Sequence, residues 1–298
     1  MIVRRGPRRA TARLPLLARI DRKARRIILR GLLYLVLVLG AIVVLVPIYW
    51  FVRSSLMNLA AVFKFPPILW PRRPVWANFV EAITIAPFLL YTRNTLIIII
   101  PAVLGTLLTA SMSAFGFARF NFPLRGMWFS FVLGAIILPP AVVLIPQFLM
   151  WSGLHLVNTF YPLILPLWFG GGAFNVFLLR QFMLTIPRDF DDAARIDGAG
   201  YFRIYWQIMI PLVQPALMAV GLFQFFFLWN DFFFPLIYLN DPDTYTLAIG
   251  LSNFIGSYAT QWNIMLAAAV IVVVPPVILF FIGQRYFVEG VTLTGIKG

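Results

Sequence analysis

Four aspartates crowd into nine residues of this chain, and three arginines lie among and beside them. Clustered carboxylates are one way to hold a divalent metal ion. Here alanines and bases are interleaved with the acids, so the negative charge is balanced close by in the sequence. That pattern favours contact with another protein surface over a metal site. The residues are Asp189, Asp191, Asp192 and Asp197, with Arg188, Arg195 and Arg203.

Other familiar chemistries find few residues to work with. The chain has no cysteine and one histidine, His155, which excludes disulfides and thiolate chemistry and leaves no histidine cluster for a metal ion. A nucleotide-binding P-loop needs Gly-Lys followed by Ser or Thr, and none of Lys23, Lys64 and Lys297 stands in that context. We therefore expect no catalytic site, no metal site and no cofactor of the chain's own.

The elements that position these residues are predicted by a composition typical of membrane proteins. Apolar residues make up 61% of the chain, charged residues only 11%, and the mean hydropathy is +0.90. A helix needs roughly 17 to 25 apolar residues to cross the bilayer, and six stretches qualify. We expect an all-α polytopic membrane protein with about six transmembrane helices, near Gly31–Phe51, Asn94–Phe115, Met127–Met150, Phe160–Phe182, Leu212–Leu239 and Ile264–Ile282.

The distribution of charge predicts the orientation. The formal net charge is +14, and eleven of the 24 basic residues lie in residues 1–30, which favours a cytoplasmic flank over nucleic-acid binding because Lys and Arg resist translocation. We expect a basic tail at 1–30, a transmembrane domain at 31–298 and both termini in the cytoplasm. Residues 53–93 oppose this scheme, because six spans place them outside although they carry five bases against Glu81.

Residues 187–211, which contain the aspartates, are predicted to form a helix, a turn and a second helix on the cytoplasmic side. Carboxylates after Pro187 suit a helix amino terminus, Gly198 suits its end, and Tyr201 to Ile210 forms a second amphipathic segment before Pro211. Ala193 and Ala194 offer a small-residue face for a partner. A helix lying on lipid is the alternative, but such helices favour Lys and Arg.

This segment carries a family resemblance. The run Asp192-Ala193-Ala194-Arg195-Ile196-Asp197-Gly198-Ala199, followed at the right distance by Pro211, resembles the EAA loop of ABC-importer permeases, with Asp192 in place of the usual Glu. Further stretches are similar to the carbohydrate-uptake branch of that family, including the six-span permease subunit of maltose-type importers. They are Asn94–Leu96, Phe117–Phe120, Ile145–Gln147, Phe177–Phe182, Trp229–Phe232, Gln284–Gly290 and Gly295–Gly298.

The resemblance implies a fold, a role and partners. It implies the type I importer permease fold with cytoplasmic coupling helices, and half of a translocation path for a sugar or oligosaccharide in a prokaryotic inner membrane. The implied partners are a homologous second permease, two cytosolic ATP-binding-cassette subunits that bind ATP and Mg, an extracytoplasmic solute-binding protein and membrane lipid, but no nucleic acid. It assigns ATPase coupling to Asp192, Ala193, Ala194, Asp197, Gly198, Ala199 and Pro211.

A second group, Trp229, Asn230 and Asp231, lies within the fifth predicted span. A carboxylate inside a membrane is costly, so a cavity or a polar partner is expected for Asp231. In one interpretation Trp229 stacks on a sugar ring and the other two residues bind hydroxyls. In the other, they make a helix-end or interhelical polar contact. An ion-coupled secondary transporter that uses Asp231 and Glu289 is the alternative function.

Overall fold

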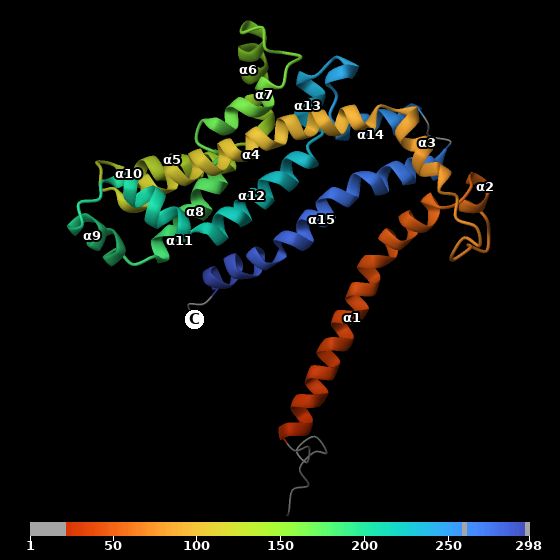
Figure 1. The fold of residues 1–298 in the computed structure, drawn as a ribbon, viewed down its shortest axis with the longest axis horizontal. Coiled ribbons are helices and arrows are strands. Elements are labelled where there is room, and N and C mark those ends of the chain that lie inside the picture. Colours follow the sequence, from red (N-terminus) through yellow and green to blue (C-terminus); the bar gives the residue numbers. More distant parts are fainter. Residues whose placement is uncertain (1–21, 258–260, 296–298) are drawn as a thin grey trace, which may run out of the picture. The chain divides into compact units, whose positions relative to one another are not determined.

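The computed structural model describes residues 22–257 and 261–295, and every regular element there is helical (Figure 1). The chain divides into two units, Met1–Val52 and Arg53–Gly298. The first contains most of α1 (Arg22–Ser55), within which the predicted span Gly31–Phe51 lies. The predicted basic tail falls largely on residues 1–21, which are outside the described residues.

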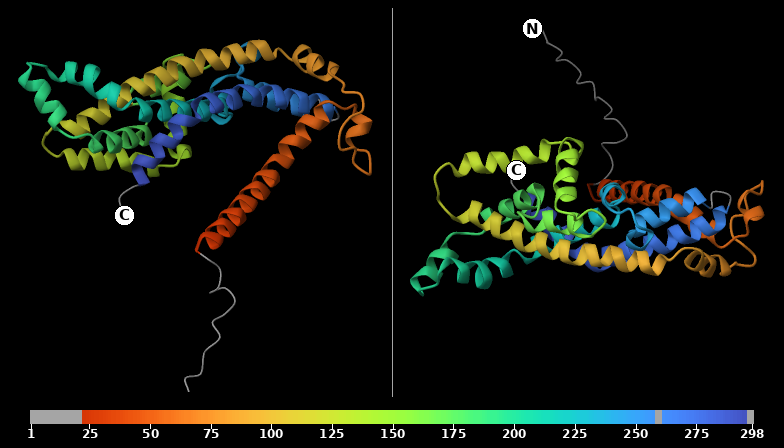
Figure 2. Two further views of the ribbon diagram at one scale, coloured as in Figure 1. Left: turned by 60° about the horizontal axis from the view of Figure 1, so that its bottom comes forward. Right: turned by 90° about the horizontal axis from the view of Figure 1, so that it is seen from above.

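The second unit consists of many helices of unequal length (Figures 1 and 2). The two longest are α4 (Phe88–Arg119) and α15 (Trp262–Gly295). The others are α2 (Leu59–Val62), α3 (Ala77–Ile85), α5 (Arg125–Ile137), α6 (Pro140–Gly153), α7 (Tyr161–Ile164), η2 (Leu165–Trp168), α8 (Ala173–Thr185), α9 (Asp189–Ile196), α10 (Tyr201–Ile204), η3 (Tyr205–Met209), α11 (Ile210–Leu212), α12 (Gln214–Trp229), α13 (Phe233–Tyr238), η4 (Pro242–Thr244) and α14 (Leu247–Ser257).

Helix α4 is the central scaffold, and it packs against α8, α12, α14 and η2. Small residues make this close packing possible, because they let neighbouring helix backbones approach. Gly105 shows how close, since a Cβ atom added there would lie 2.5 Å from the indole nitrogen of Trp168. The fully buried alanines of α4 lie four or eight residues apart along one face of the helix, at Ala102, Ala110, Ala114 and Ala118.

Three of the predicted spans are less regular than the hydropathy pattern suggested. The stretch Met127–Met150 is interrupted at Leu138–Pro139, and helices 125–137 and 141–153 meet at an angle of 96°. The stretch Phe160–Phe182 is interrupted by Gly170–Gly172, all with positive φ. The stretch Leu212–Leu239 is wrong as one helix, because α12 ends at Trp229 and α13 begins at Phe233.

The number of predicted spans agrees with the structure within a range. In the part of the chain that the structure describes, four helices are long and apolar enough to cross a membrane, or up to six if each bent pair forms one span. Proline explains one break, because Pro139 and Pro140 lack the N–H groups that a continuous helix uses. The second bent pair joins 201–212 to 214–229 at 77°.

Candidate functional site

The segment Arg188–Leu212 forms the predicted helix, turn and second helix. Helix α9 runs from Asp189 to Ile196 and carries Asp189, Asp191 and Asp192 in its first turn. The helix dipole stabilises negative charge at this end. The second helical stretch, α10 to α11, runs from Tyr201 to Leu212. Both predicted helices of this segment are confirmed.

The turn between the two helices is built around Gly198, which has a φ of +78°. The N–H of Gly198 donates to Arg195 O at 3.0 Å, and the N–H of Ala199 donates to Ala194 O at 2.9 Å. These two bonds form a Schellman motif, which needs a left-handed residue where glycine is favoured. Gly198 therefore ends α9 and turns the chain toward α10.

An ion pair joins α9 to the end of α4. Arg119 Nε lies 3.0 Å from Asp191 Oδ2, and the two side chains are only 3% and 7% exposed. The same guanidinium donates through Nη2 to Ile186 O at 3.0 Å. The charge of Arg119 is therefore balanced at the point where the chain leaves α8 and enters α9. The two residues lie far apart in the sequence, so no local sequence pattern pairs them.

Apolar contacts hold the rest of the segment against the same surface. Ala194, Ile204, Tyr205 and Met209 are buried in one cluster with residues of α4 and α8. The Tyr205 hydroxyl is 2.7 Å from the Ser111 hydroxyl of α4. The prediction that Ala194 faces a partner is therefore wrong, because its small side chain packs against the chain's own core.

The opposite face of α9 is open. Asp192, Ala193 and Ile196 share this outward face by their three- and four-residue spacing, and all three are exposed, Ile196 to 87%. Asp197 and Gly198, at the end of the helix, are exposed too. Ile196 was not among the predicted site residues. The sequence signal that could have identified it is an apolar isoleucine in a short helix that consists mostly of charged residues and alanine.

The sequence predicted that the second helix ends before Pro211, and this prediction is wrong. Helical structure continues through Leu212, and Pro211 itself is exposed. The stretch Tyr205–Met209 is a π-helix. A proline inside a helix removes one backbone hydrogen bond and crowds the preceding turn, and a wider π turn is one way in which helices accommodate such a residue.

The second predicted group does not form one polar site. Trp229 is 4% exposed, stacks on Phe225 at 5.4 Å between ring centroids and donates from its indole nitrogen to Val272 O at 3.2 Å. Its ring is thus occupied by the chain's own packing, so the interpretation of Trp229 as a sugar-stacking surface is wrong. The Asn230 amide donates to Phe226 O of its own helix at 2.8 Å.

Asp231 differs from its two neighbours because it lines a cavity of about 170 Å³. Its Oδ1 accepts a hydrogen bond from the N–H of Phe234 at 3.3 Å. Three further polar side chains line this cavity, those of Gln147, Gln224 and Tyr238. Asn175 donates to Gln224 Oε1 at 3.0 Å, which fixes that amide in place.

The remaining polar residues of this cavity were missed as site residues. Gln147 was noted only as part of a family stretch, and a glutamine inside an apolar helix was the available signal for Gln224. The buried Tyr238 hydroxyl has no hydrogen-bond partner among the described residues. Such a group suits a cavity that receives a polar ligand. The arrangement suits hydroxyl recognition and offers no nucleophile with an adjacent base.

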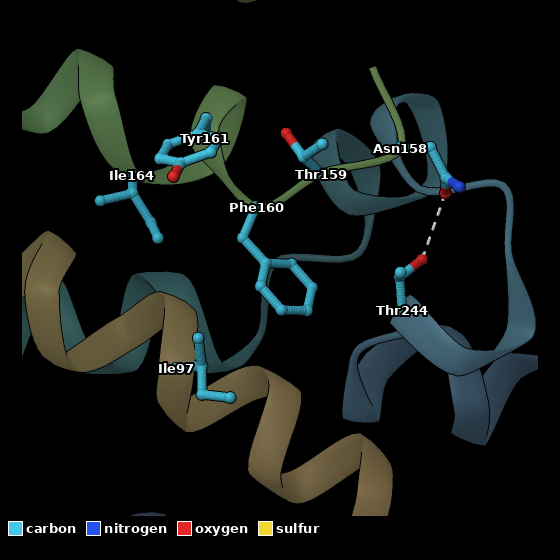
Figure 3. Close-up of a pocket in the computed structure, with 7 residues that line it drawn as sticks. All are labelled: Ile97, Asn158, Thr159, Phe160, Tyr161, Ile164 and Thr244. Carbon is cyan, nitrogen blue, oxygen red and sulfur yellow. Dashed lines mark hydrogen bonds between the residues drawn. The ribbon is translucent and has the colours of Figure 1, made fainter. Parts of the chain in front are cut away.

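A larger, mostly apolar pocket is lined by Ile97 of α4 and by residues of the loop before α7 (Figure 3). Its volume is about 370 Å³. Asn158 forms its polar corner, where Oδ1 accepts a hydrogen bond from the Thr244 hydroxyl at 3.3 Å. The same oxygen accepts from the N–H groups of Asn240 at 2.9 Å and Asp241 at 3.0 Å. Asn158 therefore fastens the loop before η4 to the loop before α7.

Neither cavity is built to hold a metal ion. Within residues 22–257 and 261–295, no three His, Asp or Glu side chains lie close enough together to bind one. The acidic residues of α9 instead contact different partners. Asp191 pairs with Arg119, and Asp192 lies 3.9 Å from Arg195.

Two named permease proteins resemble this chain over most of its length. It is 36% identical over 205 residues to the arabinooligosaccharides transport system permease protein AraQ of Halalkalibacterium halodurans, covering 69% of this chain and 73% of that protein. It is 31% identical over 267 residues to the sn-glycerol-3-phosphate transport system permease protein UgpE of Yersinia enterocolitica, covering 87% and 94%.

A solved structure confirms the fold. One chain of a bacterial ABC transporter involved in the import of the acidic polysaccharide alginate superposes with a TM-score of 0.77 at 23% identity, covering 90% of this chain and 98% of that one. Residues 106–293 match the family described as binding-protein-dependent transport system inner membrane component. The chain therefore belongs to this family, the multi-pass inner-membrane permease subunits of ABC importers.

Proposed function

We propose that the chain forms half of a carbohydrate translocation path and that Arg188–Leu212 couples this path to separate ATPase subunits. A second, homologous permease would supply the other half, and two cytosolic ATP-binding-cassette subunits would bind ATP and Mg²⁺. A permease subunit is a non-catalytic membrane component, so the free energy of transport enters through these partners. As a member of a binding-protein-dependent system, the chain works with a solute-binding protein.

The anchored and open faces of α9 are the observation that carries the coupling role. One face is fixed to α4 by the Arg119–Asp191 ion pair at 3.0 Å, while Ile196 and Asp197 point away from the chain. A partner that pushes on the open face therefore moves α4, which packs against α8, α12 and α14. Rigid transmission of this kind can switch a path between two access states.

The carbohydrate assignment rests on the relatives and on the polar cavity. The relatives' names include arabinooligosaccharides and sn-glycerol-3-phosphate, and both kinds of compound carry free hydroxyl groups. Asp231, Gln147, Gln224 and Tyr238 supply both donors and acceptors to a cavity with otherwise apolar walls, a composition typical of small-ligand sites. In this proposal Asp231, and not Trp229, contacts the substrate.

The proposed orientation follows from the coupling role. If α9 docks on cytosolic ATPase subunits, residues 183–211 are cytoplasmic, and up to six spans place both termini on the same side. The basic residues 1–30 then form a cytoplasmic tail ahead of the transmembrane domain 31–298, in keeping with the excess of Lys and Arg that cytoplasmic segments carry.

Copurification tests the coupling role. The full transporter would be purified through this chain as wild type and as Asp197→Arg. A base at the carboxyl end of a helix interacts favourably with the helix dipole, so we expect α9 to stay folded in this variant. The substitution does reverse the charge of the docking face. We expect the wild type to retain the ATPase and show substrate-stimulated ATP hydrolysis, and Asp197→Arg to lose both.

The matched control is Asp243→Arg, which reverses an exposed carboxylate outside Arg188–Leu212. It should retain the ATPase. Transport in liposomes on an ion gradient, by wild-type chain that carries no ATPase, would contradict the proposal and make Asp231 and Glu289 the residues to study.

A further inference from the structure

The segment between α1 and α3 holds a concentration of positive charge that the transport role leaves unexplained. Residues 53–76 contain four bases and no acid, namely Arg53, Lys64, Arg72 and Arg73. The predicted orientation places this segment outside, where the bias toward Lys and Arg in cytoplasmic loops disfavours such a cluster. Binding of a ligand by this segment would explain why these bases are present, whereas the predicted orientation does not explain them.

The segment is folded into a defined shape by hydrogen bonds. The N–H of Val75 donates to Leu56 O at 2.9 Å. The Asn78 amide donates to Ser55 O and to Met57 O, each at 2.8 Å. Buried Arg53 donates from Nε to Ile68 O. Both ends of the segment are thus closed against each other, so the residues between them are held in a fixed arrangement.

A cavity of about 510 Å³ opens in this arrangement. Three of its lining side chains are the cations Lys64, Arg72 and Arg73, and its lining contains no acidic residue. All three cations are exposed, and none forms an ion pair among the described residues. A cavity with three cations and no counter-charge is suited to an anion that accepts several hydrogen bonds, such as a phosphate group.

Aromatic and apolar side chains surround the cations in the sequence, and they are exposed. Phe65 is 90% exposed, Trp76 66% and Phe63 63%. Tryptophan close to Lys and Arg, in a segment that follows an apolar helix, is typical of the boundary between the headgroups and the hydrocarbon of a membrane. The combination favours a ligand that has an anionic end and an apolar end.

We propose that this cavity binds the phosphate-bearing headgroup of an anionic phospholipid, with Lys64, Arg72 and Arg73 around the phosphate and the acyl chains beside the exposed aromatic residues. Phosphatidylglycerol, whose headgroup carries one negative charge, is the lipid of this chemistry used as the probe below. The inference concerns residues 57–75 and does not depend on how α9 couples to an ATPase.

Native mass spectrometry of the detergent-purified transporter tests the proposal. Phosphatidylglycerol and phosphatidylcholine with identical acyl chains would be titrated onto the wild type, Arg72→Gln and Arg73→Gln. We expect the wild type to prefer phosphatidylglycerol and each substitution to reduce that preference about five-fold, the contribution of one base at an anionic lipid surface. Arg72→Lys and Arg73→Lys should retain most of the preference.

The control is Arg93→Gln, which removes an exposed arginine that does not line the cavity. It should leave the lipid preference unchanged within two-fold. An equal loss in Arg93→Gln, or equal binding of the two lipids by the wild type, would overturn the proposal. If an arginine substitution prevents purification, Lys64→Gln takes its place with the same expected result.

Two further arms separate the lipid from other anions. Displacement of phosphatidylglycerol by millimolar inorganic phosphate would assign the cavity to free phosphate and overturn the lipid proposal. Weaker binding of the solute-binding protein by Arg72→Gln in nanodiscs of phosphatidylcholine alone would assign the cations to protein docking instead. The proposal predicts no displacement by phosphate and unchanged affinity for the binding protein.

Discussion

Arg119 Nε at the end of α4 lies 3.0 Å from Asp191 Oδ2 in the first turn of α9, with both side chains almost fully buried. Charges in such surroundings are costly unless they are paired. The contact therefore determines where α9 lies, because movement of α9 away from α4 would separate two buried charges. It also ties the first turn of α9 to the carboxyl end of α4, a helix of 32 residues, which is what a lever requires.

Removing one member of this pair should destabilise the protein strongly. For Arg119→Met or Asp191→Leu we expect a loss of roughly 3 to 5 kcal/mol in the free energy of unfolding, because the remaining charge stays buried without its partner. The double variant Arg119→Met, Asp191→Leu should recover much of that loss, since apolar replacement of both partners leaves no unpaired charge. Denaturant unfolding of the purified chain in detergent measures both effects.

The exposed pair on the same helix is the control. Arg195 and Asp192 are 3.9 Å apart and 46% and 66% exposed, so Arg195→Met should cost less than about 1 kcal/mol. Equal costs for Arg119→Met and Arg195→Met would show that burial of the first pair does not matter to stability.

Gly198→Ala should destabilise the turn that ends α9. An alanine at a φ of +78° costs about 1 kcal/mol because its Cβ crowds the following carbonyl. Gly200→Ala is the matched control, since Gly200 has a φ of −74° and open space around the position of a Cβ. Thermal unfolding should rank Gly198→Ala below Gly200→Ala, and Asn at position 198 should be tolerated better than Ala.

If Gly198 also sets the direction of the docking surface, Gly198→Ala should lower substrate-stimulated ATP hydrolysis while Gly200→Ala leaves it unchanged. An unaltered stimulation in Gly198→Ala, at a lowered melting temperature, would limit the role of Gly198 to stability.

Asp231 and Trp229 should respond differently to substitution although they are neighbours in sequence. Asp231→Asn removes a charge from the lining of the 170 Å³ cavity, so the substrate concentration for half-maximal ATPase stimulation should rise about ten-fold, the effect of one hydrogen bond to a charged group. Trp229→Phe keeps the packing on Phe225 but loses the bond to Val272. It should lower stability by about 1 kcal/mol and leave substrate dependence unchanged.

The same assay can reject this division of roles. A rise in the half-maximal substrate concentration for Trp229→Phe, with none for Asp231→Asn, would restore the sugar-stacking interpretation of Trp229 and remove Asp231 from the proposed path.

Local signals in the sequence predicted the helices and turn of Arg188–Leu212 well. Acids at a helix start and glycine at its end act within one turn of the chain, so Asp189 and Gly198 could be interpreted without knowledge of the fold. The Arg119–Asp191 pair could not be predicted in this way. Its two residues lie far apart in the sequence, and only the packing of α9 against the end of α4 brings them together.

Hydropathy predicted which stretches are apolar but not where they break. The interruption at Asn230–Phe232 leaves the average apolar character of Leu212–Leu239 high, so a window over that stretch registers one span. The burial of Trp229 could not be predicted from the sequence either, because a tryptophan beside polar residues suits a core and a binding surface equally. The carbonyl of Val272, on a helix that is distant in the sequence but packed against α12, decides between them.

Labelling of single cysteines tests the coupling role of α9 most directly, because the natural chain contains no cysteine. Ile196→Cys, at a position 87% exposed, would be treated with a maleimide in the transporter with and without its ATPase subunits, beside Asp243→Cys as a control. We predict fast labelling of Ile196→Cys without the ATPase and at least ten-fold slower labelling with it, while the control reacts equally in both. Equal rates at position 196 in the two preparations would show that the open face of α9 does not dock on the ATPase, and would contradict the account.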